Sequence, residues 1–284
     1  MLTDKEKFKD LISAIARKLR FRPVIVEKDY YLTLILNNIE ACLSDKVVFK
    51  GGTLLNKAHL NYHRLSEDLD FTYCFPLAAR SQRSKAITPI REKMPDFLKT
   101  LQLASDKPEG EGFNNSTQYV FKVKYPSVLT GKDDLIKIEI SLRQPPIDKP
   151  VNTQIKHFYQ DPFTGEDLFP QGKVLSLSLE EAVAEKLKAA ISRKDVAIRD
   201  FYDLWHIAEF GFDFHSDKFK RLFKRKVNDE GYTGDYKKDF GLSADKLALL
   251  RRQVDTDLMP VIRANESFDL DRVFKRFNVI LQKV

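Results

Sequence analysis

Phe49-Lys-Gly-Gly-Thr-Leu-Leu-Asn-Lys57 and Arg64-Leu-Ser-Glu-Asp-Leu-Asp-Phe71 are the two stretches that decide the fold of this chain. The β-branched and aromatic run at 46–50 predicts a strand that ends at the glycines. The pattern that follows predicts a helix over 54–60 and a second strand over 69–73. A strand that leads through glycines into a helix exposes unpaired backbone N–H groups at the positive end of the helix dipole, where a phosphate can bind.

Gly51, Gly52 and Thr53 are therefore candidate phosphate-binding residues. Glycine allows a phosphate to approach the backbone closely, and Thr53 adds a hydroxyl group at the start of the helix. The same glycine pair is also typical of an ordinary turn, so this signal needs support from elsewhere in the chain.

Acidic residues supply that support. Asp68 and Asp70 are two residues apart in a strand, so both side chains lie on one face. Glu139 lies on the polar face of the alternating run 135–143 and offers a third carboxylate. Adjacent carboxylates repel each other unless a cation lies between them, and oxygen ligands favour Mg²⁺ or Mn²⁺. Three such carboxylates facing a helix N-terminus predict a two-metal site for phosphoryl or nucleotidyl transfer, and the alternative for each is a solvated strand face.

The rest of the chain predicts an α+β domain followed by helices. Apolar periodicity and strand alternation predict helices over 3–20, 23–43 and 80–103, the last broken at Pro89, and strands over 117–125 and 135–143, with the prolines at 145–150 ending the sheet. A capping box at Ser178-Leu-Glu-Glu181 begins a helical region, with helices expected over 199–209, 217–227, 243–254 and 270–281. The predicted boundaries are 1–175 for the α+β domain and 176–284 for the helical bundle.

Composition excludes several classes of protein. The chain has 284 residues, 43% hydrophobic and 31% charged, which suits a folded protein with a substantial core. No apolar run approaches the roughly 20 residues of a membrane-spanning helix, and the charged start Met1–Asp10 is unlike a secretory signal. Two cysteines exclude a disulfide scaffold and suit a reducing cytoplasm. The net charge of +7 permits a polyanionic partner, and the basic run 221–226 is consistent either with an RNA contact or with an amphipathic helix face.

The order of strand, Gly-Gly-Thr, helix and Arg-x-Ser-x-Asp-x-Asp-Phe resembles the signature of the nucleotidyltransferase superfamily. More closely, the chain resembles the AbiEii-type nucleotidyltransferase toxins of type IV toxin–antitoxin systems, which are related to the MenT-type tRNA nucleotidyltransferase toxins. Ala184-Glu-Lys-Leu-Lys-Ala-Ala190 and Arg199-Asp-Phe-Tyr-Asp-Leu204 resemble further motifs of that family, as do Val26-Glu-Lys-Asp-Tyr30 and the strand around 137–141. The resemblance spans 27–204, and beyond it the chain is similar only as a helical bundle.

The resemblance implies a nucleotidyltransferase-like domain with a mixed sheet flanked by helices, and a role for each matched residue. Gly51, Gly52 and Thr53 would hold the triphosphate, with Arg64 and Ser66 in contact with phosphate or acceptor. Asp68, Asp70 and Glu139 would bind the metal ions. Lys186 and a downstream aspartate, Asp200 or Asp203, would complete the cleft from the helical domain, and Arg193 and Arg199 are further candidates for phosphate contact or simple surface charges.

The resemblance also implies an activity. The chain would be a Mg²⁺-dependent toxin that works in the cytoplasm and transfers NMP from an NTP to RNA, with the 3′ end of tRNA as the expected acceptor. Its antitoxin would be encoded separately, with no direct binding expected. Two alternatives stay open: transfer to a hydroxyl group of a protein or small molecule, and a non-catalytic RNA-binding or regulatory module.

Overall fold

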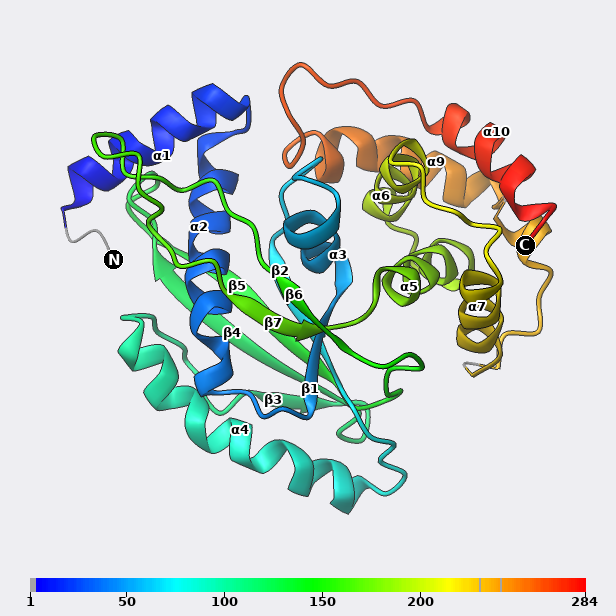
Figure 1. The fold of residues 1–284 in the computed structure, drawn as a ribbon, viewed down its shortest axis with the longest axis horizontal. Coiled ribbons are helices and arrows are strands. Elements are labelled where there is room, and N and C mark those ends of the chain that lie inside the picture. Colours follow the sequence, from blue (N-terminus) through cyan, green and yellow to red (C-terminus); the bar gives the residue numbers. More distant parts are fainter. Residues whose placement is uncertain (1–3, 230, 241) are drawn as a thin grey trace. The chain divides into compact units, whose positions relative to one another are not determined.

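The computed structural model describes residues 4–229, 231–240 and 242–284, and the chain divides into two compact units between Leu177 and Ser178 (Figure 1). The elements of the first unit are the helices α1 (Lys5–Leu19), α2 (Pro23–Asn38), α3 (Gly51–Leu54) and α4 (Arg80–Thr100), the short turns η1 (Ile39–Ala41) and η2 (Leu55–His59), and the strands β1 (Val47–Lys50), β2 (Asp68–Tyr73), β3 (Glu111–Phe113), β4 (Gln118–Pro126), β5 (Asp133–Ser141), β6 (Val151–Gln154) and β7 (Lys173–Ser176). The elements of the second unit are α5 (Leu179–Ser192), α6 (Ile198–Glu209), α7 (Asp217–Asp229), α8 (Tyr236–Asp239), α9 (Ala244–Gln253), η3 (Val254–Leu258) and α10 (Leu270–Leu281).

The strands of the described residues form one seven-stranded mixed sheet in the order β3-β4-β5-β2-β1-β7-β6. The β2–β5 and β1–β7 pairs are parallel, and the other pairs are antiparallel. The predicted α+β class with a mixed sheet, flanking helices and a helical carboxy-terminal region is confirmed. The two central strands, β2 and β5, carry the three predicted acidic residues.

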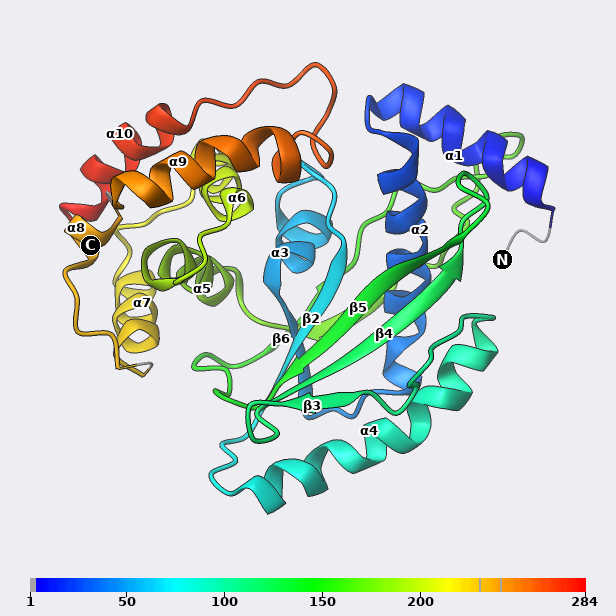
Figure 2. The same ribbon diagram turned by 180° about the vertical axis from the view of Figure 1, so that it is seen from behind.

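One face of the sheet forms the core of the first unit. Alternate residues of β4 and β5, such as Phe121 and Ile138, are fully buried. Helix α2 crosses this face (Figures 1 and 2), and its Tyr31 stacks on Tyr125 of β4 with ring centroids 4.3 Å apart. Helix α1 packs on α2 through Phe8. On the opposite face, Asp68 and Asp70 of β2 and the residues of β5 are half-buried or exposed, whereas Thr72 of β2 is buried.

Two predictions about the first unit are wrong. The prolines at 145–150 do not end the sheet, because β6 and β7 follow and extend it beyond β1. The residues of β6 are mostly exposed and polar, so this strand has no apolar alternation to reveal it. Helix α4 is not broken at Pro89, and it also runs through Pro95. Pro89 has no backbone N–H to donate to the Lys85 carbonyl one turn earlier. Both residues are exposed, so water can bind that carbonyl instead.

In the second unit, Ser178 caps α5 as expected, and its Oγ accepts a hydrogen bond from the Glu181 backbone N–H. The Glu181 carboxylate lies 2.7 Å from Lys226 Nζ, which also binds Glu185 at 2.8 Å. Lys226 is therefore a buried partner of α5, whereas Lys224 of the same basic run is exposed.

None of the helices in the described residues is both long and apolar enough to span a bilayer.

Candidate functional site

The Gly-Gly-Thr segment forms the first turn of a helix. The predicted start at Leu54 is wrong by three residues, because α3 already begins at Gly51 and continues into the π-helical turn η2. Gly51 has a φ of +80°, in the left-handed region that glycine adopts without strain. A left-handed residue followed at once by helix is not apparent from apolar spacing, and this explains the late predicted start.

Gly51 lies directly against the acidic strand. Lys50, the residue before it, is paired with Asp70 in the β1–β2 ladder. A Cβ atom at position 51 would lie 2.9 Å from the Asp70 Cβ and closer still to Asp70 Oδ2. The absence of a side chain at Gly51 is therefore what allows the Asp70 carboxylate to lie beside the glycine turn.

Gly51→Ala is expected to lower activity by about 10²-fold, because the added methyl group displaces Asp70 or the turn. Gly131→Ala is the matched control: Gly131 has a similar φ of +68°, but a Cβ there would meet nothing within 4 Å. The measurement is steady-state transfer of labelled nucleotide by both variants. Equal activity of the two would show that the contact between Gly51 and Asp70 does not matter.

The structure brings the three carboxylates onto one face of adjacent strands. In the parallel β2–β5 ladder Asp70 is the register partner of Glu139, and Asp68 is the partner of Lys137. Asp68 Oδ1 accepts a hydrogen bond from the Lys137 backbone N–H at 3.3 Å. Thr53 Oγ1 donates to the Asp68 carbonyl at 2.5 Å and so links the helix start to the acidic strand. The Asp68, Asp70 and Glu139 side chains are all partly exposed.

The donor set suits a hard divalent cation. Carboxylate oxygens are the ligands that Mg²⁺ prefers, and Asp68, Asp70 and Glu139 supply them next to the glycine turn. Within residues 4–229, 231–240 and 242–284, no group of three or more His, Cys, Asp or Glu side chains is gathered closely enough to hold a metal ion. The chemistry of the three side chains fits the cation, although the structure does not gather them into a complete ligand set.

Arg64 and Ser66 lie in the loop before β2, and both are buried. Arg64 Nη1 donates to the Leu65 carbonyl at 3.0 Å, so part of the guanidinium group holds the loop that leads into Asp68.

The second unit gathers the remaining predicted residues. Lys186 Nζ of α5 lies 2.8 Å from Asp200 Oδ1 and 2.9 Å from Asp203 Oδ2, both on α6. The ammonium group therefore forms an ion pair with both aspartates. Asp200 also accepts from Arg193 Nη1 at 2.8 Å, and the Arg193 side chain is 53% exposed. Arg199 is partly exposed on α6.

Sequence reasoning gave no role to Asp29 and Lys57, a fully buried ion pair next to the glycine turn. Both residues lie in motif segments of the sequence, and the available signal was a lysine four residues after Thr53. A lysine side chain usually points to solvent, so burial could not be read from the sequence.

A family model described as "Nucleotidyl transferase AbiEii toxin, Type IV TA system" matches residues 35–281. The chain belongs to the AbiEii nucleotidyltransferase toxin family. It is therefore a nucleotidyltransferase, and the AbiEii resemblance of the motifs is confirmed. The family match includes the glycine turn, the three strand carboxylates and the Lys186 cluster.

Solved structures share this AbiEii fold. MenT4, a nucleotidyltransferase toxin from Mycobacterium tuberculosis H37Rv, is 18% identical with a TM-score of 0.64, over 97% of this chain and 90% of that chain. A protein from H. pylori described as a candidate nucleotidyltransferase is 17% identical with a TM-score of 0.50, over 92% of this chain and 95% of that chain. No curated protein sequence matches the chain. At these identities the structural matches establish the fold, and activity rests on the family match.

Proposed function

We propose that this nucleotidyltransferase transfers NMP from an NTP to RNA, with the 3′-terminal hydroxyl group of tRNA as the acceptor, and so acts as a toxin by blocking translation. The observation that carries the proposal is the contact of the Gly51 turn with Asp70. This contact supports the proposal because backbone N–H groups of such a turn suit a phosphate, and the Asp70 carboxylate suits a divalent cation.

Asp68 and Asp70, with Glu139, would hold Mg²⁺ or Mn²⁺. Bound there, the cation would neutralise charge on the phosphates and promote ionisation of the acceptor hydroxyl group. Gly51, Gly52 and Thr53 would bind triphosphate oxygens through backbone N–H groups and a hydroxyl group. In-line attack on the α-phosphate forms the new phosphodiester bond, and pyrophosphate leaves with the electron pair of the broken P–O bond.

Lys186 is proposed to bind a phosphate oxygen in the same reaction as a compact positive charge. Asp200 and Asp203 would hold its ammonium group in a fixed position. Arg193, Arg64 and Ser66 are proposed as further contacts for phosphate or acceptor.

Incubation of the purified protein with each labelled NTP and purified tRNA tests the proposal. We expect label on tRNA, with loss of label when the tRNA 3′ end is oxidised beforehand, because the acceptor hydroxyl group is then gone. Chelation by EDTA should stop the reaction, and added Mg²⁺ or Mn²⁺ should restore it. Label that appears on protein or small molecules from a total extract, and never on tRNA, would contradict the RNA acceptor and favour the alternative hydroxyl groups.

The net charge of +7 agrees with a polyanionic acceptor. Membership of an enzyme family argues against the alternative of a non-catalytic module.

We propose that the protein works in the cytoplasm, where NTPs and tRNA are available, and that a separately encoded antitoxin opposes it without binding it. Co-purification of the toxin with that antitoxin would contradict the last point.

A further inference from the structure

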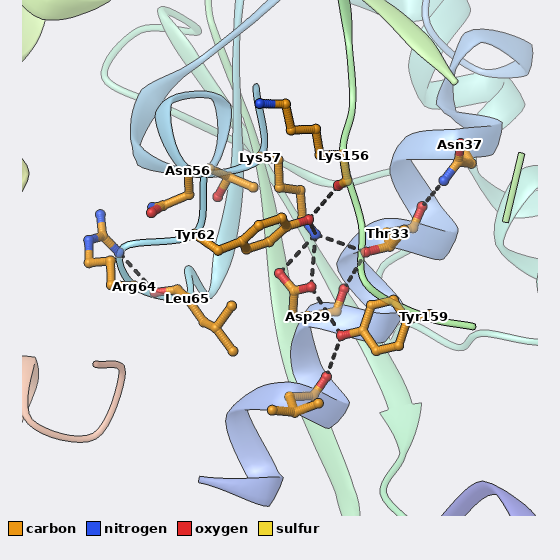
Figure 3. A network of polar contacts seen from close by, with 12 residues as sticks. Asp29, Thr33, Asn37, Asn56, Lys57, Tyr62, Arg64, Leu65, Lys156 and Tyr159 are labelled. Atoms are coloured by element: carbon orange, nitrogen blue, oxygen red, sulfur yellow. Dashed lines mark hydrogen bonds and ion pairs between the residues drawn. The ribbon is translucent and has the colours of Figure 1, made fainter. Parts of the chain in front are cut away.

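A buried polar cluster connects α2 with the end of the helical segment that follows the glycine turn (Figure 3). We name it the α2 anchor, and it consists of Asp29 and Thr33 of α2, Lys57 of η2, Tyr62, and Tyr159. Lys57 Nζ lies 2.8 Å from Asp29 Oδ1, and it donates to Thr33 Oγ1 at 2.8 Å and to Tyr62 OH at 3.3 Å. Tyr159 OH lies 2.8 Å from the Val26 carbonyl and 3.0 Å from Asp29 Oδ2, and these two acceptors share its single proton. The cluster thus joins three segments that are distant in the sequence.

The α2 anchor is withdrawn from solvent, because Lys57 and Asp29 are each 1% exposed and Thr33 and Tyr159 are fully buried. Burial lowers the pKa of Lys57, and the adjacent Asp29 carboxylate opposes that shift. Burial raises the pKa of Tyr159 and Tyr62 well above the usual value, so both hydroxyl groups stay protonated and able to donate. A buried ion pair is rarely the most stable filling of a core, and its best-supported use is to fix one arrangement among several.

The segment that the anchor holds is conformationally unusual. Lys57 belongs to a π-helical turn, and Asn61 and Tyr62 both have positive φ values, of 49° and 57°. Such backbone persists only where surrounding contacts hold it in place. Here Tyr62 OH donates to the Lys156 carbonyl, and the Lys156 N–H donates to the Lys57 carbonyl at 2.9 Å. The segment is therefore held from the α2 side by the anchor.

The same segment is held from the sheet side at its other end. The Thr53 hydroxyl group donates a hydrogen bond to the Asp68 carbonyl. Gly51 lies so close to Asp70 that a methyl group on the Gly51 Cα would clash with the Asp70 side chain. Asn56, the residue before Lys57, donates a hydrogen bond from Nδ2 to the Gly52 carbonyl at 2.9 Å. This bond connects the glycine turn to the part of the helix that the anchor holds. A small shift of Lys57 would therefore change the spacing between the glycines and the acidic strand.

We propose that the α2 anchor is a positioning device that sets the Gly51–Thr53 turn against Asp68 and Asp70 and thereby determines affinity for the nucleotide. This inference rests on the proposed function, in which the turn binds the triphosphate. The anchor residues do not touch the substrate. They act through the backbone of α3 and η2.

Two conservative pairs of variants test the proposal. Tyr159→Phe removes one hydroxyl group from the anchor, and Tyr125→Phe is its control, because Tyr125 is an equally buried tyrosine whose OH donates to Asp134 at 2.7 Å away from the turn. Thr33→Val removes the hydroxyl group that accepts from Lys57, and Thr33→Ser retains it. Each protein is measured for melting temperature, for KM and kcat, and for hydrogen exchange at the Leu60 and Tyr62 amides, which bond to the Leu55 and Asn56 carbonyls.

We expect Tyr159→Phe and Thr33→Val to raise KM for the NTP by roughly tenfold with a smaller change in kcat, and to speed exchange at both amides. Tyr125→Phe should lose a similar amount of thermal stability while KM and these exchange rates stay at wild-type values, and Thr33→Ser should also keep them. The proposal is overturned if Tyr159→Phe and Thr33→Val change melting temperature alone, as Tyr125→Phe does. A wild-type protein without NTP-dependent transfer would refute the proposed function and the nucleotide part of this inference, whereas the exchange rates would still show whether the anchor holds the turn.

Discussion

Asp68→Asn and Asp70→Asn should each reduce nucleotidyl transfer by about 10³-fold or more, which corresponds to about 4 kcal/mol of transition-state stabilisation. Asparagine keeps the shape of the side chain but removes the charge that would hold a divalent cation. Asp70 has the larger structural role, because it lies next to both Gly51 and Glu139. Labelled-NMP incorporation into tRNA, followed under single-turnover conditions, measures the loss.

Asp133→Asn is the control for these two variants. Asp133 is an exposed carboxylate on β5, the strand that also carries Glu139, but it lies at the far end of that strand. We expect its activity to match that of the wild-type protein. If Asp68→Asn and Asp70→Asn transfer nucleotide as fast as Asp133→Asn does, the proposed metal-binding site is wrong. A toxicity assay in cells should rank the variants in the same order.

Lys226→Met should destabilise the second unit by about 3–5 kcal/mol, because it removes the cation that lies 2.7 Å from the fully buried Glu181 carboxylate. Burial acts to lower the pKa of Lys226, but Glu185 and Glu181 outweigh it and raise the pKa, so the lysine is charged at neutral pH. Methionine fills similar volume, and the loss is therefore electrostatic.

Lys224→Met on the same helix serves as the control, because Lys224 is exposed and its loss should change stability by no more than about 0.5 kcal/mol. Chemical denaturation of both variants gives the two free energies of unfolding. The same comparison tests the basic run 221–226 as an RNA contact. If Lys224→Met weakens RNA binding while Lys226→Met weakens only folding, the run combines an exposed basic face with a core ion pair. Equal stability of the two variants would contradict the buried role of Lys226.

Several features could be predicted because they are local. Asp68 and Asp70 share a face because strand side chains alternate, and Ser178 caps α5 because its hydroxyl group reaches a backbone N–H within one turn. Apolar spacing also predicted α6, α7, α9 and α10, whereas the short helix α8 was not predicted. The family motifs indicated the nucleotidyltransferase fold for the same reason, since they lie in short contiguous segments.

Other features were not predictable because they depend on residues far apart in the chain. Glu139 lies beside Asp70 and not Asp68, and only the register of β2 against β5 decides this. Strands β6 and β7 have little apolar pattern, and their place in the sheet follows from the pairing of β7 with β1 and of β6 with β7. The continuous α4 through Pro89 depends on which side of the helix faces water.

The sequence by itself determined the chemistry available to this protein: a glycine turn, paired acidic residues and a lysine on a helix, each recognisable within a few residues. The tertiary structure alone decided which of these groups are neighbours, and it added the α2 anchor, whose Asp29 and Lys57 are 28 residues apart. The physical reason is that backbone geometry sets local patterns residue by residue. Burial and partner choice instead result from many weak contacts summed over the folded chain.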